Sequence, residues 1–297
     1  MRRKIKITLL ALLSIVLLFM LLAIGVPYIN FTATSADDNP NKKNIIVIAH
    51  RGASGLAPEN TLASFAKAME FNVDFIELDV HVSKDDSLIV MHDYNVERTT
   101  SGEGDIEDLT YSYIKTLDAG SEFKPEFKGE KVPTLDEVLK LSGGKTKVLI
   151  ELKWPKDGLY KDLVKKVVEC VRRNKAESWV VIQSFEVAYL DEMHSLAPDL
   201  ECQQLVFAPT SLLPMHVTRK AVAGNFTPLP YVTSVNPHHL FVTKRWVEKM
   251  HKEHKTVYPF TLNTEDKMRK AINLGVDGII TNYPNVANKV LGRTSSQ

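Results

Sequence analysis

Short apolar runs and longer amphipathic stretches alternate along the chain from residue 44 onward. Runs such as 45–49, which are rich in isoleucine and valine, are typical of buried strands. Stretches such as 160–174 place apolar residues on one side of a helix and lysines on the other. The pattern predicts strands at 45–49, 74–82, 147–152, 179–183, 201–207, 231–235, 256–262 and 278–281, and helices at 61–71, 134–141, 160–174, 186–197, 244–253 and 265–274.

This alternation predicts the fold class. Eight strands separated by helices over about 250 residues have the size and rhythm of an α/β fold of the (β/α)₈ TIM-barrel type. An open doubly wound sheet is the alternative. A turn at 84–87 and a short apolar run at 88–91 return too quickly for a parallel crossover, so we predict a hairpin after strand 74–82. Residues 82–130 contain several glycines and break the alternation, which predicts a small insertion after the second strand.

The N-terminal residues differ from the rest of the chain. Positive charges between Arg2 and Lys6 precede a long uncharged apolar run, which predicts a transmembrane anchor or signal segment at 1–30. The positive charges predict a cytoplasmic N-terminus, so the domain at 44–297 would lie outside the cytoplasm on a polar tether at 31–43. Cleavage at the small residues 34–36 would instead make the protein secreted.

The composition argues against a nucleic-acid-binding protein and against a disulfide-rich one. The 297 residues carry a formal net charge of +1, which gives no electrostatic basis for nucleic-acid binding. Two cysteines, Cys170 and Cys202, are too few for a disulfide framework and lie in apolar patterns, so we expect buried thiols.

Polar side chains interrupt the predicted strands near their ends. The first strand ends on His50 and Arg51, and the second carries Glu77 and Asp79 two residues apart, hence on one face. Carboxylates on one face of an apolar strand repel each other and lose hydration, and a divalent cation would relieve both costs. Glu151, at the end of the third strand, adds another oxygen ligand. Because active sites of such barrels lie at the carboxyl ends of the strands, these residues predict an oxygen-only site for Ca²⁺ or Mg²⁺.

The order of the motifs resembles that of the glycerophosphodiester phosphodiesterase family. The resemblance covers roughly residues 45–291, and the final motifs are similar to those of the secreted bacterial type. The matching stretches are 50–52, 58–61, 77–80, 90–93, 150–153, 183–185 and 275–281, followed by the terminal motifs at 259–263 and 281–284.

This resemblance implies hydrolysis of glycerophosphodiesters to an alcohol and sn-glycerol 3-phosphate. It implies a divalent cation, Ca²⁺ ahead of Mg²⁺, on Glu77, Asp79 and Glu151. Two alternatives stay open: a phospholipase D- or C-like activity on lipids, and a non-catalytic binder of glycerophosphate polymers of the cell wall. The expected partners are small glycerophosphodiesters, with those wall polymers as further candidates and a membrane contact through the N-terminal segment.

The resemblance also implies roles for individual side chains. His50 and His92 would form the acid–base pair, because imidazole titrates near neutral pH. The sequence leaves open which of them is the base. Arg51 and Lys153 would supply positive charge to a phosphodiester oxygen.

Other candidates surround these groups. Phe185 and Phe260 would form an apolar wall for the substrate, or else only pack the top of the barrel. We expect Glu59 and Asn60 to order the loop after the first strand, with Asn60 as helix N-cap. Many relatives have tryptophan where this chain has Pro259-Phe260, and aspartate in place of Asn282. These two departures bear on the preference for the leaving group.

Overall fold

The computed structural model describes residues 42, 44–207 and 226–293. The predicted membrane or signal segment at 1–30 lies outside these residues, as does the predicted tether apart from Lys42. Among the helices of the described ranges, none is long and apolar enough to span a bilayer.

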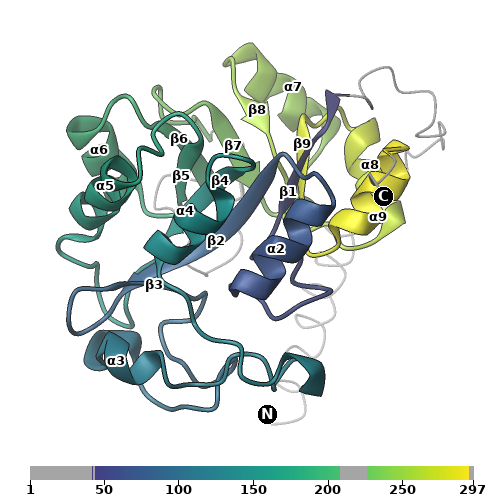
Figure 1. Cartoon of the computed structure of the whole chain (residues 1–297). Helices are drawn as coiled ribbons and strands as arrows, with labels where there is room; N and C mark the ends of the chain where they lie inside the picture. Colours follow the sequence, from purple (N-terminus) through teal and green to yellow (C-terminus); the bar gives the residue numbers. More distant parts are fainter. Residues whose placement is uncertain (1–41, 43, 208–225, 294–297) are drawn as a thin grey trace, which may run out of the picture. The chain divides into compact units, whose positions relative to one another are not determined.

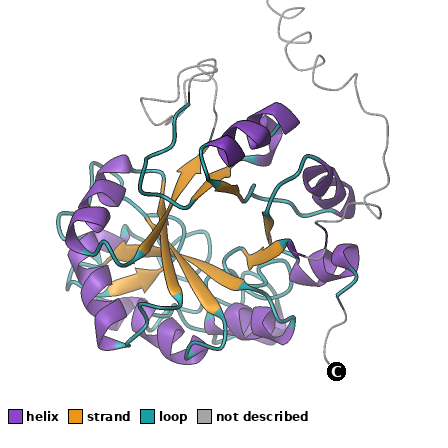
Figure 2. Cartoon of the chain, turned by 90° about the horizontal axis from the view of Figure 1, so that it is seen from above, coloured by secondary structure: helices purple, strands orange, loops and turns teal. Residues whose placement is uncertain are grey.

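Eight parallel strands form the centre of the fold, in the order β8-β7-β6-β5-β4-β2-β1-β9 (Figure 1). Backbone hydrogen bonds from Leu262 to Ile280 and from Ile280 to Pro259 join the two ends of this sheet into a nearly closed barrel, with helices around it (Figure 2). The predicted TIM barrel is confirmed, and the open doubly wound sheet is wrong. The strands are β1 (Ile46–Ala49), β2 (Phe75–Val82), β4 (Lys147–Leu152), β5 (Val180–Ser184), β6 (Glu201–Val206), β7 (Ser234–Pro237), β8 (Thr256–Val257) and β9 (Gly278–Thr281).

The outer helices follow the predicted amphipathic stretches, and α9 was not predicted. At α4, the side chains of Thr134 and Glu137 form a capping box with the backbone of the first turn. At α2, the prediction of Asn60 as N-cap is wrong: the Thr61 hydroxyl accepts from the Ser64 N–H, and Asn60 adopts a left-handed backbone that frees its side chain for the barrel. The helices are α2 (Leu62–Glu70), α4 (Leu135–Ser142), α5 (Leu163–Arg173), α6 (Val187–Leu196), α7 (Lys244–Lys252), α8 (Glu265–Asn273) and α9 (Pro284–Leu291).

Two predicted strands differ from the observed ones. The predicted strand at 231–235 starts later, at Ser234, because a turn closed by Val232 N–H and Leu229 C=O occupies its first half. The predicted strand at 256–262 is reduced to β8, since Pro259 has no N–H for the ladder.

Alternation along the strands builds two apolar layers and leaves a polar end. On β4, Val148, Ile150 and Leu152 pack in the main core with the helices, whereas Leu149 belongs to a small inner layer. Glu151 lies two residues after Leu149 and therefore faces the barrel interior above that layer. The other buried members of the inner layer, one from each of four strands, are Ile48, Phe75, Val181 and Ile280.

The predicted hairpin is present as β2 and β3 (Leu88–Val90), which pair antiparallel with Val80 opposite Val90. The chain then forms a segment at 91–133 with a small apolar core of its own. It contains η4 (Ile106–Asp108), α3 (Tyr111–Ile114) and η5 (Pro125–Phe127), and its core comprises Ile89, Met91, Val96, Ile106, Ile114, Leu117, Ala119 and Val132. This segment corresponds to the predicted insertion and begins beside His92.

Candidate active site

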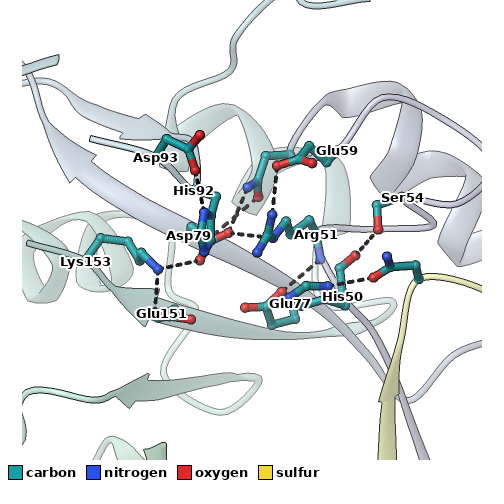
Figure 3. A network of polar contacts seen from close by, with 12 residues as sticks. His50, Arg51, Ser54, Glu59, Glu77, Asp79, His92, Asp93, Glu151 and Lys153 are labelled. Carbon is teal, nitrogen blue, oxygen red and sulfur yellow. Dashed lines mark hydrogen bonds and ion pairs between the residues drawn. The ribbon is translucent and has the colours of Figure 1, made fainter. Parts of the chain in front are cut away.

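Three buried carboxyl groups lie together inside the end of the barrel. Asp79 on β2 stands opposite Glu151 on β4 in the strand register, and Glu77 precedes Asp79 on the same face. One oxygen from each of the three lies within 4.8 Å of the others (Figure 3). The structure thus brings together the three predicted metal ligands.

Both carboxyl oxygens of Glu77 accept hydrogen bonds, which favour its ionised form. Its Oε2 accepts from the Arg51 backbone N–H at 2.8 Å, and its Oε1 accepts from the Gln183 amide at 3.0 Å. Burial, and then the charges of Asp79 and Glu151, raise the pKa of Glu77 well above its usual value. Hydrogen bonding therefore favours the carboxylate while burial and repulsion oppose it, and a cation would resolve this conflict.

Asp79 and Glu151 share Lys153. Its Nζ lies 2.8 Å from Glu151 Oε1 and 3.6 Å from Asp79 Oδ1. Burial would lower the pKa of Lys153, but the two carboxylates outweigh burial and raise it. Burial raises the pKa of Glu151, whereas Lys153, followed by His92 and Arg51, lowers the pKa of Asp79 despite burial.

One carboxylate oxygen of this cluster accepts no hydrogen bond from the described residues. Asp79 Oδ1 is buried and has no hydrogen-bond partner among the described residues. Three carboxylates also exceed the two cations, Arg51 and Lys153, that contact them. A hard, oxygen-only donor set with spare negative charge fits Ca²⁺ or Mg²⁺.

A chain of amide side chains supports Glu77 from inside the barrel. The Asn236 amide donates to Gln183 Oε1 at 3.0 Å and to Gln203 Oε1 at 2.9 Å, and Ser234 donates to the Asn236 oxygen at 2.8 Å. Sequence analysis missed this network. The sequence signal for this network is a buried polar residue in each of three consecutive strands, β5 to β7.

The two predicted histidines are each fixed at Nδ1. His50 Nδ1 lies 2.7 Å from the amide oxygen of Asn282, and because that oxygen only accepts, the contact favours the tautomer with the proton on Nδ1. Burial, and next Arg51, lower the pKa of His50 to about 3. His92 Nδ1 lies 2.6 Å from Asp93 Oδ1, and this hydrogen bond keeps the pKa of Asp93 below its usual range. Asn282 and Asp93 were not predicted as site residues.

The loop after β1 orders the remaining charges. Arg51 donates to Glu59 Oε1 at 2.9 Å, and its Nε lies 3.4 Å from Asp79 Oδ2. The Asn60 amide donates to the same Asp79 oxygen at 2.8 Å. Glu59 and Asn60 therefore connect this loop to the carboxylate cluster.

The predicted aromatic residues form a row of contacting rings that begins next to Lys153. Phe185 and Phe260 are half-buried, and their ring centroids lie 5.9 Å apart in an edge-to-face contact. Trp154, which sequence analysis missed, extends this row beside Lys153, and His238 extends it at the other end. The row is partly packed and partly open, so it can contact the carbon atoms of a substrate.

Comparisons with known proteins agree with this geometry. Residues 50–286 match the glycerophosphoryl diester phosphodiesterase family. The chain is 35% identical over 292 residues to a glycerophosphodiester phosphodiesterase of Bacillus subtilis, covering 93% of this chain and 97% of that one. It is 38% identical over 242 residues to one of Caldanaerobacter subterraneus, covering 80% and 94%. A phosphodiesterase of Oleispira antarctica, solved in complex with the product sn-glycerol-3-phosphate, superposes with a TM-score of 0.72 at 29% identity, covering 83% and 96%.

The raised pKa of Glu77 predicts a pH-dependent stability in chelator. The protonated carboxyl stabilises the fold at low pH, and this contribution is lost as the pH rises through the raised folded pKa. The free energy of unfolding, measured with urea between about pH 5 and 8, should fall with pH in wild type relative to Glu77→Gln, because the glutamine side chain cannot ionise. Desolvation lowers the pKa values of His50 and His81 to about 3, and the pH dependence that these two histidines cause should be the same in both proteins.

The matched control is Glu177→Gln at an exposed ion pair, whose free-energy difference from wild type should stay flat with pH. A flat difference for Glu77→Gln as well would contradict the electrostatic account of the cluster.

Proposed function

Because this chain belongs to the glycerophosphoryl diester phosphodiesterase family and is a glycerophosphodiester phosphodiesterase, we propose that its hydrolysis requires a divalent cation and the histidine pair. Glu77, Asp79 and Glu151 would hold the cation, with Ca²⁺ the first candidate and Mg²⁺ the second. The observation that carries this proposal is the cluster of three buried carboxylates, in which Asp79 Oδ1 has no hydrogen-bond partner among the described residues. When bound, the cation would polarise a phosphoryl oxygen and offset its charge.

The histidines would take opposite roles because their partners differ. His50 Nδ1 contacts a neutral amide, which leaves its Nε2 to accept a proton from the attacking water or glycerol hydroxyl. His92 Nδ1 is hydrogen-bonded to the anionic Asp93, which orients the ring so that its Nε2 can donate a proton to the departing alcohol. Arg51 and Lys153 would hold the negative charge that gathers on the phosphoryl oxygens.

The product would be sn-glycerol 3-phosphate. The product complex of the Oleispira antarctica relative supports this assignment. Phe185 and Phe260 would contact the carbon atoms of the substrate, and affinity would then depend mainly on phosphate and glycerol. The non-catalytic binder does not fit, because both histidines and all three carboxylates are present and adjoin one another.

We propose further that the N-terminal segment places the enzyme outside the cytoplasm, attached to the membrane or secreted after cleavage. The basic cluster at 2–6 and the uncharged run after it support this proposal. The full chain, expressed in a bacterial host, should be degraded by protease added to intact protoplasts, or be recovered in the medium. Full protection together with a soluble cytoplasmic fraction would rule it out.

Product analysis tests the reaction. With glycerophosphocholine, the enzyme should release choline and sn-glycerol 3-phosphate, lose turnover in chelator, and regain it with Ca²⁺ or Mg²⁺. Glu77→Gln should lose most of its activity, whereas the exposed Glu177→Gln should keep it. Phosphocholine as product, a strict demand for acylated substrates, or full activity in chelator would each refute the corresponding part of the proposal.

Substitution of either histidine should remove catalysis and spare the fold. His50→Ala and His92→Ala are each expected to lower kcat by about 10²–10⁴-fold, the usual contribution of acid–base assistance. The exposed His194→Ala, whose ring stacks on Tyr231, serves as control and should retain wild-type kcat. A variant with normal kcat would exclude that histidine from the mechanism.

A further inference from the structure

One guanidinium joins the partners of two active-site groups. In Figure 3, Asp93 lies against His92, and Glu59 lies against Arg51. Arg98, from the segment at 91–133, donates from Nε to Asp93 Oδ2 at 2.6 Å. Its Nη1 and Nη2 donate to the two oxygens of Glu59 at 2.9 and 2.7 Å.

These contacts form a continuous chain of charges. It runs from His92 through Asp93, Arg98 and Glu59 to Arg51, whose Nε lies 3.4 Å from Asp79. Every link but the last is a hydrogen bond of 2.9 Å or less. The chain therefore connects the second histidine to the carboxylate cluster over the outside of the site.

The backbone that carries Arg98 is firmly anchored. Val96 and Thr100 on either side are buried, and the Thr100 hydroxyl donates to the Val96 carbonyl at 2.6 Å. Val96 belongs to the apolar core of the insertion. This anchored backbone presents the Arg98 guanidinium between Glu59 and Asp93, whose other partners are Arg51 and His92.

We propose that Arg98 is a positioning residue, which couples the orientation of His92 to that of Arg51 by holding Asp93 and Glu59 at the same time. Without its charge, two carboxylates would face each other, and Asp93 would be free to rotate away from His92 Nδ1. A lysine cannot replace it, because an ammonium is a point donor and cannot span both carboxylates as a planar fork does. This inference rests on the proposed role of His92.

Arg98→Ala should lower kcat by up to about 100-fold, the scale expected for a displaced catalytic group, with KM changed little because Arg98 does not hold the substrate. Arg98→Lys should recover little of this loss. The matched control is Arg172→Ala: Arg172 also bridges two carboxylates, Glu177 and Asp199, at similar exposure but on the outer helix α5. It should keep wild-type kcat.

Two readouts separate positioning from stability. Arg98 is 47% exposed, so guanidinium ions at low, non-denaturing concentration should enter the space left in Arg98→Ala and restore part of kcat. They should restore nothing in His92→Ala. Combining Arg98→Ala with Asp93→Asn should cost clearly less than the product of the two single losses, because Arg98 acts through Asp93.

The outcomes are distinguishable. A kcat for Arg98→Ala within about twofold of wild type, as for an ordinary surface ion pair, overturns the proposal, as do a selective rise in KM or multiplicative losses with Asp93→Asn. If Arg98→Ala does not fold, the same comparisons made with Arg98→Lys test the proposal in its place. Normal activity of His92→Ala in the same assay would instead refute the proposed function.

Discussion

Mutual repulsion among three buried carboxyl groups is the constraint on which the rest of the site depends. Glu77, Asp79 and Glu151 reach into the same end of the barrel with oxygens 4.8 Å apart or less. Nothing in the apolar layer beneath them can offset that charge. Three side chains offset part of this negative charge. Lys153 lies between Asp79 and Glu151 and Arg51 lies beside Asp79. The Gln183 amide donates a hydrogen bond to Glu77. Asp79 Oδ1, 3.6 Å from the Lys153 ammonium, still has no hydrogen-bond partner among the described residues.

The loop after β1 contains backbone conformations that are rare for residues other than glycine. Arg51 and Asn60 both adopt positive φ, and Gly52 between them lies so close to α2 that an added Cβ would sit 2.4 Å from Ser64 Oγ. In return, the Arg51 backbone N–H reaches Glu77 while its guanidinium reaches Asp79 and Glu59. The two residues with a strained backbone, Arg51 and Asn60, are thus the ones that hydrogen-bond the carboxylate cluster.

The sequence predicted those parts of the molecule that depend on local pattern. Alternation was enough to put Glu77 and Asp79 on one face of β2 and Glu151 at the end of β4, and the short return after β2 was enough for the hairpin. Contacts between distant segments were beyond it: Asn282 lies 232 positions from His50, and the amide network joins three strands. The N-cap of α2 was missed for a similar reason, because Asn60 turns away to reach Asp79, and that partner belongs to another strand.

The most direct test of the account is a crystal structure grown with Mn²⁺, an oxygen-preferring ion with a strong anomalous signal. We expect an anomalous peak at about 2.0–2.6 Å from oxygens of Glu77, Asp79 and Glu151, the range of hard-cation coordination. A well-ordered site with no peak there, in which Lys153 alone neutralises the carboxylates, would contradict it.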